Sequence, residues 1–373
     1  MELINATRMT AGYNMGLEPS GRELLVVVIK GTFVLPKPGE QVRLHDEQLP
    51  LIMADTFTGE PGFSAPVYEI DFAPRKHACD VLLVGSAHAP QGRPVARMTV
   101  SLRVGPMAKT CEVVGDRVWR AGITGISASA PQPFTRMPVS YDCAFGGADR
   151  HGEDKSQHDA FLPNPVGRGW HKHLKNAWVD GTPLPNIEEP GQTVNAPNDK
   201  CKPMAFGPLG RGWAPRACHA GTYDQRWLDE GFPFLPEDFD ERYYQAAPED
   251  QQLARPKGPI EVALSGFTPD GVRQFVLPHF EAPVHVFTRR GEREDYTAAL
   301  DTIAFEPDRE HFTITWRVAR PLLNNVHEIA YVLVGRKTRG WWRATEQGKR
   351  YYSSFAQLLD WRRRFDGAVD SRP

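Results

Sequence analysis

The pattern of hydrophobic and polar positions predicts short β-strands in the first third of the chain. Leu24–Leu35 is a nearly continuous apolar run, interrupted only at Lys30 and Gly31, which is typical of a strand buried on both faces. Met98–Val104 alternates strictly between apolar and polar side chains, which predicts a strand with one buried and one solvated face. Pro and Gly separate these runs from further candidate strands at Val67–Phe72, Val81–Val84 and Cys111–Val114.

The same β pattern returns after residue 259. Ile260–Phe267 and Val272–Leu277 flank a Thr-Pro-Asp-Gly sequence and predict a β-hairpin. His311–Val318 alternates again, with Phe312, Ile314, Trp316 and Val318 on one face, and Ile329–Val334 is a further apolar strand. Strands and helices do not alternate, and no repeat of fixed period occurs. We therefore expect a mainly β fold, with antiparallel sheets arranged as a sandwich or barrel.

Only the C-terminal tail carries a helical pattern. Tyr351, Phe355, Leu358 and Leu359 share one face of a helix expected over about residues 354–366, with Ser354 and Gln357 as a capping box and Gly367 at its end. Residues 336–364 contain nine Lys or Arg side chains against two acidic ones. A run of basic residues of this kind usually forms a solvent-exposed face without a binding role. The alternative interpretation is a contact surface for an acidic partner.

The central residues 131–259 keep neither a helical nor a strand period. They hold 17 of the 33 prolines and four tryptophans, so we predict a long ordered loop region rather than a flexible linker. Large aromatic side chains need a core in which to be buried, and proline lowers the entropy cost of fixing a loop. The expected organisation is a β-rich part over residues 1–130, a loop-rich central lobe over 131–259, and strands of the same β unit plus the helix over 260–373.

Composition narrows the function classes. The 373 residues carry a formal net charge of −2, which gives no global argument for binding nucleic acid or an anionic membrane. The longest aliphatic run, Leu24–Ile29, is too short to span a bilayer, and the N-terminus has no signal-peptide pattern, so a cytoplasmic protein is expected. Five cysteines without a C-x-x-C pair predict reduced and mostly buried thiols.

Motifs for catalysis, cofactors or metals are lacking, and we expect no enzyme activity, no cofactor and no metal site. Gly-x-Ser-x-Gly, phosphate-loop, His-Glu-x-x-His and dinucleotide-binding motifs are absent from the sequence. Ser86 and His88 are expected in a core or turn. Four histidines in the central lobe could in principle gather a metal ion, but their spacing is not that of a metal motif, and we expect them at the surface: His151, His158, His171 and His173.

The strongest catalytic alternative is a carboxylate cluster. Glu237, Asp238, Asp240 and Glu241 lie beside Trp227, Phe239 and Tyr243, and paired carboxylates flanked by aromatic rings are typical of glycoside hydrolases. Pro236-Glu237-Asp238 also fits the start of a helix, where acidic residues complement the helix dipole. The helix start is the favoured interpretation, and a cell-wall hydrolase or glycan-binding module is the alternative.

The central lobe supplies two sets of candidate residues. Aromatic rings and arginines are enriched at protein interfaces, and we predict partner contacts from Arg168, Trp170, Trp178, Trp213, Arg216 and Trp227. Polar side chains and glycines in a segment without β-ladders are needed to satisfy backbone groups and to permit close turns. This scaffold set comprises Gly146, Gly147, Asn164, Pro165, Gly167, Asn186, Glu188, Tyr223, Asp224, Asp238 and Asp240.

Short motifs follow one another over nearly the whole chain: Asp71–Pro74, Val84–Gly92, Gly115–Trp119, Met137-Pro138, Ala144–Gly147, Asn164–Gly169, Leu184–Glu188, Gly221–Asp224 with Trp227, Pro236–Asp240 and Ala247-Pro248. This succession resembles one bacterial family of unknown function that is found in type VI secretion loci. Genes of that family lie beside those for the VgrG spike, PAAR-tipped effectors and toxins. Some relatives carry a C-terminal pentapeptide-repeat extension, which this chain lacks.

The resemblance implies a cytosolic, non-catalytic chaperone or adaptor. Such a protein would bind a cognate effector and help to load it onto the VgrG spike, with the effector and a VgrG or PAAR protein as its partners. No catalytic residue comes with the family. A third possibility is a purely structural part of the secretion apparatus.

Overall fold

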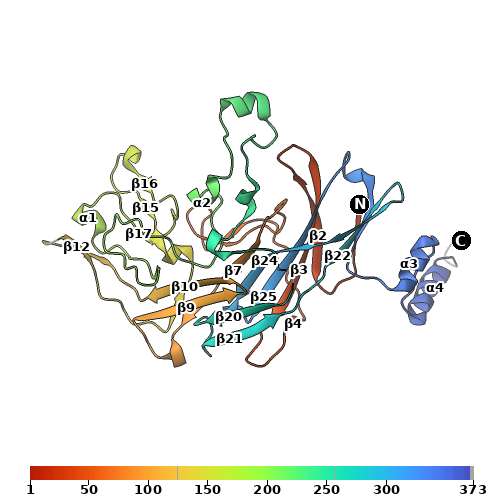
Figure 1. The fold of residues 1–373 in the computed structure, drawn as a ribbon, viewed down its shortest axis with the longest axis horizontal. Coiled ribbons are helices and arrows are strands. Elements are labelled where there is room, and N and C mark those ends of the chain that lie inside the picture. Colours follow the sequence, from red (N-terminus) through yellow and green to blue (C-terminus); the bar gives the residue numbers. More distant parts are fainter. Residues whose placement is uncertain (124, 257, 370–373) are drawn as a thin grey trace.

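The computed structural model describes residues 1–123, 125–256 and 258–369, and β-strands dominate its architecture (Figure 1). The largest sheet has seven strands, with β4 (Arg43–Leu44) paired to β3 outside the main order. That order is β19 (Gln252–Leu253), β7 (Cys79–Leu83), β24 (Ala299–Glu306), β25 (His311–Pro321), β3 (Glu23–Val34) and β2 (Thr10–Leu17). All neighbours in this sheet are antiparallel except β7 and β24.

Two further sheets complete the β unit. A five-stranded sheet has the order β18 (Ile187–Glu188), β10 (Met107–Val114), β9 (Arg97–Val104), β20 (Ile260–Ser265) and β21 (Val272–Leu277). A four-stranded sheet has the order β1 (Glu2–Asn5), β26 (Ile329–Val334), β22 (Pro283–Thr288) and β23 (Arg293–Thr297). The expected hairpin is β20 and β21, which pair from Ile260 with Leu277 to Ser265 with Val272.

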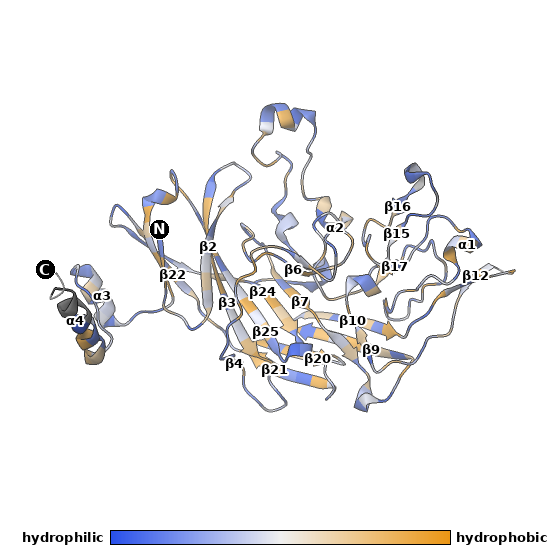
Figure 2. Ribbon diagram, turned by 180° about the vertical axis from the view of Figure 1, so that it is seen from behind, coloured by the Kyte–Doolittle hydropathy of each residue, from blue (hydrophilic) through white to orange (hydrophobic). Residues whose placement is uncertain are grey.

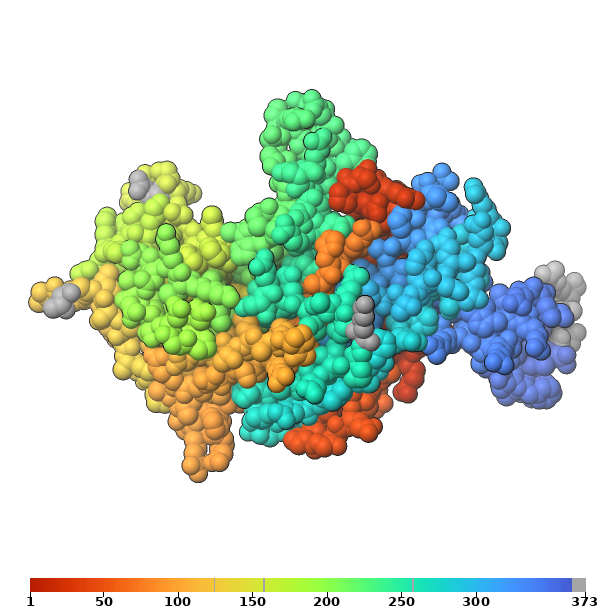
Figure 3. Space-filling view, viewed as in Figure 1, coloured from red at the N-terminus to blue at the C-terminus, as the bar shows by residue number. Residues whose placement is uncertain are grey.

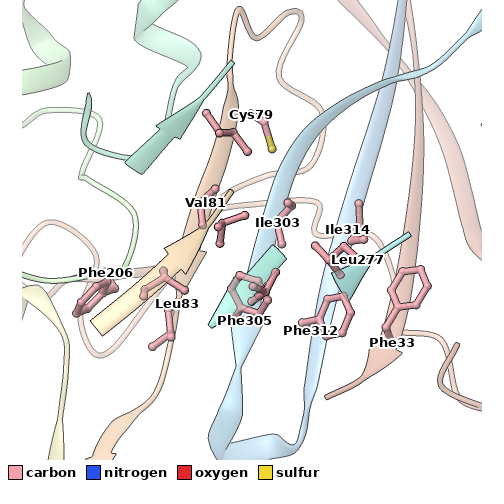
Figure 4. Packing of buried hydrophobic residues seen from close by; sticks show 14 of the residues in the cluster. Phe33, Cys79, Val81, Leu83, Phe206, Leu277, Ile303, Phe305, Phe312 and Ile314 are labelled. Atoms are coloured by element: carbon pink, nitrogen blue, oxygen red, sulfur yellow. The ribbon is translucent and has the colours of Figure 1, made fainter. Parts of the chain in front are cut away.

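The main core lies where the faces of these sheets meet. Apolar residues concentrate on the central strands (Figure 2). Phe33, Ile303, Phe305 and Phe312 of the seven-stranded sheet pack near Leu277 of the five-stranded sheet (Figure 4). Burying a large apolar side chain contributes about 1.5–3 kcal/mol. The mainly β, sandwich-like prediction is therefore confirmed, and the sheets do not close into a barrel.

The central strands are buried on both faces. β3 is buried from Leu24 to Phe33, as its continuous apolar run predicts. For β25, the sequence predicted one buried and one solvated face, and the second half of that prediction is wrong: Thr313, Thr315 and Arg317 are buried as well. On that face Arg317 forms a buried ion pair with Asp301, so its charge is neutralised inside the protein and is not solvated.

The described residues of the segment 131–259 form no long regular elements, as the loss of a helical or strand period in the sequence predicts. The longest element among the described residues of this segment is a five-residue π-helical turn, Trp227–Gly231. The segment also holds the short helices α1 (Asn176–Val179) and α2 (Ala214–Ala217). It contributes β18 to one sheet and β19 to another, so it is joined to both.

Five small strand pairs complete the sheet structure. They are β5 (Thr56–Phe57) with β6 (Pro66–Tyr68), β11 (Trp119–Gly122) with β12 (Gly125–Ala128), β13 (Arg136–Pro138) with β8 (Ser86–His88), β14 (Phe145–Gly146) with β17 (Arg168–Gly169), and β15 (Ala148–Asp149) with β16 (Asp159–Ala160). The β14–β17 pair is parallel.

Two helices end the described chain. α4 (Phe355–Val369) confirms the predicted C-terminal helix, and Gln357 N donates to Ser354 Oγ as the capping box requires. Gly367 lies inside α4 and does not end it. The sequence analysis missed α3 (Arg339–Glu346), whose Trp342 packs on His285 and Phe287 of β22. Within the described residues, no helix is both long and apolar enough to cross a membrane. All five cysteines are free and three are buried, as predicted.

Candidate partner-binding site

In the central lobe, β14 and the chain just before β17 form a crossing so close that only glycine fits there. Asn164 is fully buried, and its Nδ2 donates to the carbonyl oxygens of Tyr141 and Phe145 at 2.9 and 3.0 Å. Gly146 has a φ of +147°, and a Cβ there would lie 2.1 Å from the Asn164 carbonyl oxygen. A Cβ on Gly167 would lie 2.4 Å from Asn164 Nδ2. These residues, together with Gly147, whose Cβ would lie 2.8 Å from Gly167 O, hold β14 against β17, so the predicted scaffold role is supported.

A buried polar chain ties this crossing to the five-stranded sheet. The Arg168 guanidinium donates to Asn186 Oδ1 at 3.1 Å, and Asn186 Nδ2 donates to the Val114 carbonyl oxygen of β10 at 3.1 Å. Two residues further on, Glu188 of β18 forms a buried ion pair with Arg117 at 2.7 Å. Arg168 therefore has a structural role, because its N–H groups donate to acceptors within the protein.

Trp213 and Arg216, predicted as partner contacts, are buried, and that prediction is wrong for both. Trp213 packs edge-on against Tyr141, with ring centroids 5.2 Å apart. Arg216 pairs with Glu69 at 2.6 Å and donates to the carbonyl oxygens of Leu209 and Tyr243. A fixed guanidinium fork satisfies several acceptors at once, which explains why an arginine occupies this interior position.

Trp170 and Trp178 are partly buried rather than presented on an open face. Trp170 packs against Phe161 in a small core beneath the lobe. Trp178 stacks on His151, and Lys175 Nζ lies 4.0 Å from its ring centroid. The tryptophans of the central lobe therefore do not form one continuous exposed platform. Pro165 lines a hollow near Trp213 and Arg216.

A group of exposed apolar side chains lies instead on an arm formed by residues 219–240, coloured green in Figures 1 and 3, which projects beyond the sheets. The two sides of the arm are joined at its base. Thr222 donates from N and Oγ1 to the two carboxylate oxygens of Asp238, at 2.8 and 2.7 Å, and Asp240 N donates to His219 O at 3.0 Å. A Cβ on Gly221 would lie 2.9 Å from Pro236, so the two sides are in close contact.

Trp227 organises the tip of the arm. Its backbone N donates to Asp224 Oδ1 at 2.8 Å, and its indole Nε1 donates to Phe234 O at 2.9 Å. Tyr223 and Phe232 pack edge-on against the indole, with centroids 4.7 and 5.8 Å from it. The predicted partner residue Trp227 thus lies at the tip, half-buried by its neighbours.

Four side chains around Trp227 expose large apolar areas. Tyr223 and Leu228 are each 53% exposed, Phe232 is 64% exposed and Phe234 is 50% exposed. Side chains of this size at these exposures present about 400 Å² together, which is the scale at which an apolar patch marks an interaction site. Apart from Tyr223, which it placed in the scaffold set, sequence reasoning missed these residues. The sequence shows that these residues lie in an aromatic-rich stretch, but it does not show that their side chains are exposed.

The arm is strongly acidic. Residues 219–240 contain six Asp or Glu and one Arg. Hydrogen bonding from Arg242 lowers the pKa of Asp240 to about 2, and Asp238 is held below its usual pKa by the two bonds from Thr222. Both carboxylates are therefore ionised at neutral pH, and they place negative charge at the base of the arm.

Three of the four carboxylates at 237–241, those of Asp238, Asp240 and Glu241, have structural partners. Pro236-Glu237-Asp238 does not begin a helix, so the predicted helix start is wrong at that position. A short 3₁₀-helix, Glu241–Tyr244, begins later, where Asp240 accepts from Arg242 N. Asp238 closes the base of the arm, and Glu241 lies 3.1 Å from His77 Nε2. A glycoside hydrolase needs two carboxyls facing each other across a substrate, and these side chains are turned to different neighbours.

Ser86 and His88 meet at one carboxylate but do not form a nucleophile and base pair. Ser86 Oγ donates to Asp308 Oδ2 at 2.9 Å, while His88 Nε2 lies 2.8 Å from Asp308 Oδ1. Arg136 also donates to Asp308, at 2.7 Å. A catalytic serine must donate to the histidine that activates it, so this cluster joins β8 to the chain after β24 and has no triad geometry.

The histidines of the central lobe are only partly where the sequence placed them. His171 was expected at the surface and is buried, which corrects that expectation. His151 and His173 are partly exposed, and both contact the buried carboxylate of Asp149. His158 lies apart from them and contacts the carbonyl oxygen of Gly152.

One family match covers most of the chain. Residues 20–317 match the family described as "Uncharacterized protein conserved in bacteria (DUF2169)". Comparison with curated proteins gave no match, and comparison with solved structures gave none either.

Proposed function

We propose that this chain, which belongs to the DUF2169 family of bacterial proteins, is a non-catalytic adaptor. It would bind another polypeptide through the tip of its arm. The observation that carries the proposal is the exposed cluster of Tyr223, Leu228, Phe232 and Phe234 around a fixed Trp227. An apolar cluster held out from the sheets in this way is costly to leave in water, and a partner that covers it recovers that free energy.

The anchoring of the arm supports a binding role. Phe234 packs over Gly21 in the turn between β2 and β3, where a Cβ would lie 2.7 Å from the ring. The base is closed by the bonds between Thr222 and Asp238. A surface that is already ordered loses little entropy on binding, so more of the contact free energy appears as affinity.

The charge of the arm defines the partner. The arm carries six carboxylates along its length, and Asp224, Asp229 and Glu230 flank Trp227 in sequence. This negative charge suits a polypeptide segment that carries aliphatic or aromatic side chains flanked by Lys or Arg. The negative charge of the arm also repels acidic surfaces, so it disfavours acidic proteins as partners.

The finer role is part of the same proposal. The resemblance of the motifs to proteins of type VI secretion loci supports a secreted effector as the partner. The adaptor would hold this effector in the cytoplasm and help to load it onto a VgrG or PAAR spike protein. The engaged carboxylates at 237–241 favour this role over that of a cell-wall hydrolase.

The test is co-purification with the products of neighbouring genes, followed by affinity measurement for any complex found. Leu228→Ser combined with Phe232→Ser should weaken binding by about 100-fold or more, since each substitution removes about 1.5–3 kcal/mol of apolar contact. The matched control is Leu323→Ser with Phe63→Ser, because these are the same residue types, 67% and 57% exposed, outside the arm. Equal binding by the two double variants would refute the assignment of the arm, and failure to bind any neighbouring product would refute the adaptor role.

A further inference from the structure

A buried carboxylate in the central lobe gathers three histidines. Asp149, at the end of β15, is 1% exposed. His151 Nδ1 lies 3.0 Å from Asp149 Oδ1, and His173 Nδ1 lies 3.1 Å from Asp149 Oδ2. The backbone N of His173 also donates to Oδ2, at 2.9 Å, so the loop that carries residues 171–173 is fixed on this carboxylate.

His171 adds an unused nitrogen to this group. The side chain is 7% exposed, and its Nδ1 has no hydrogen-bond partner among the described residues. Its Nε2 lies 3.0 Å from Thr182 Oγ1, while the Thr182 hydroxyl donates its own proton to Val179 O at 2.6 Å. Thr182 Oγ1 must therefore accept from His171 Nε2–H, which places the lone pair of the neutral ring on Nδ1.

This arrangement is the one that metal-binding histidines adopt. A ligating imidazole usually donates its other N–H to a fixed oxygen, which sets the tautomer and aims the free nitrogen at the ion. Here the oxygen is Thr182 Oγ1. A buried nitrogen without a partner is otherwise destabilising, so its presence points to a ligand.

We propose that Asp149, His151 and His171 bind a divalent transition-metal ion of the zinc class, with His173 beside them. One potential ligand atom from each of the three lies within 4.8 Å of the other two. Ligands of a tetrahedral ion with bonds of about 2.0 Å lie about 3.3 Å apart, so side-chain shifts of about 1 Å or less close the site. Two imidazoles and a carboxylate form a donor set suited to Zn²⁺ and Co²⁺.

The site would join two parts of the lobe that share no long β-ladder. Asp149 ends β15 and His151 follows it, whereas His171 follows β17, and Trp178 of α1 stacks on the His151 ring. Three protein ligands leave a fourth position, which His173 or water can fill. The predicted function of this ion is to stabilise the central lobe, independently of whether the arm binds a partner.

The experiment uses the full chain without an affinity tag, stripped with a chelator and then titrated with Zn²⁺ or Co²⁺. We expect one ion per chain by elemental analysis, visible absorption of low-symmetry Co²⁺, and a melting temperature raised by about 3–5 °C at a hundredfold excess over Kd. His171→Ala and His151→Ala should each lower the affinity at least tenfold, whereas His158→Ala, in the same lobe but outside the cluster, should not.

Because His171 is buried, its variant could fail to fold, and His151→Ala then decides, since 38% of that side chain is exposed. The absence of stoichiometric Zn²⁺ or Co²⁺ binding to the unmodified chain would overturn the proposal. Binding that is equally tight in His151→Ala and in the unmodified chain would overturn it too.

Discussion

Replacing Gly146 with alanine should unfold the central lobe, because two features of this position exclude a side chain. Its φ of +147° is one that residues with a Cβ rarely adopt, and the new Cβ would lie 2.1 Å from the Asn164 carbonyl oxygen. Gly125 has a φ of +121°, and a Cβ added there would meet no atom within 4 Å, so it offers a control for the backbone strain alone.

The two contributions can be separated in magnitude. Backbone strain costs of the order of 1–3 kcal/mol at either position. At Gly146, a carbon and an oxygen that normally stay more than about 3 Å apart must also separate by about 1 Å, which breaks the β14–β17 pair and the buried bonds of Asn164. Buried groups left without partners cost about 1–3 kcal/mol each, so Gly146→Ala should lower the free energy of unfolding by about 4–6 kcal/mol.

Gly147 provides an intermediate case, since its φ of +117° is close to that of Gly125 but its Cβ would meet Gly167 O at 2.8 Å. Denaturant unfolding followed by tryptophan fluorescence should rank the losses as Gly125→Ala, then Gly147→Ala, then Gly146→Ala. If Gly146→Ala and Gly147→Ala each lowered the free energy of unfolding by within about 0.5 kcal/mol of the loss for Gly125→Ala, the crossing would not be rigid. That result would refute the claim that a close backbone contact excludes a side chain at these two positions.

Three further outcomes follow from other contacts. Asn164→Ala should cost about 2–4 kcal/mol by denaturant unfolding, since it strands two buried carbonyl groups, while Asn164→Asp should cost a similar amount by burying a charge. Burial alone would raise the pKa of Asp308, but hydrogen bonds from His88 and two other side chains lower it below its usual range. Asp308 therefore stabilises the fold above about pH 4, and this contribution is lost as the pH falls through the lowered pKa. Asp308→Asn should flatten the fall in melting temperature between about pH 5 and pH 2. Trp227→Phe removes the indole bond to Phe234 O and should speed cleavage of the arm by a protease at least severalfold, with the melting temperature changed by less than about 2 °C.

Much of the β architecture could be predicted from periodicity, because burial imposes it directly. β3 is buried on both faces and reads as an apolar run, and β9 alternates because only one of its faces meets the core. β23 (Arg293–Thr297) was missed, since it is an edge strand of polar sequence whose partners, not its side chains, make it a strand.

The candidate sites were harder to predict, because exposure in a loop region depends on contacts distant in sequence. Trp213 is buried by Tyr141, 72 residues earlier, and Arg216 by Glu69, 147 residues earlier. Phe232 has no such neighbour and stays exposed. Residue type alone assigned Trp213 and Arg216 to the surface, and nothing in the local sequence distinguishes them from Phe232.

The same dependence on distant contacts explains why an adaptor would place its binding surface on an arm. The inward faces of the three sheets are used for the core, so a larger apolar residue placed on those faces changes the packing of the β unit. The arm meets the rest of the chain at its base and where Phe234 covers Gly21. Residues such as Leu228 and Phe232 contribute little to the core and are free to match a partner. Under the proposed function, stability and recognition would be carried by different residues, and one β scaffold could serve partners of different sequence.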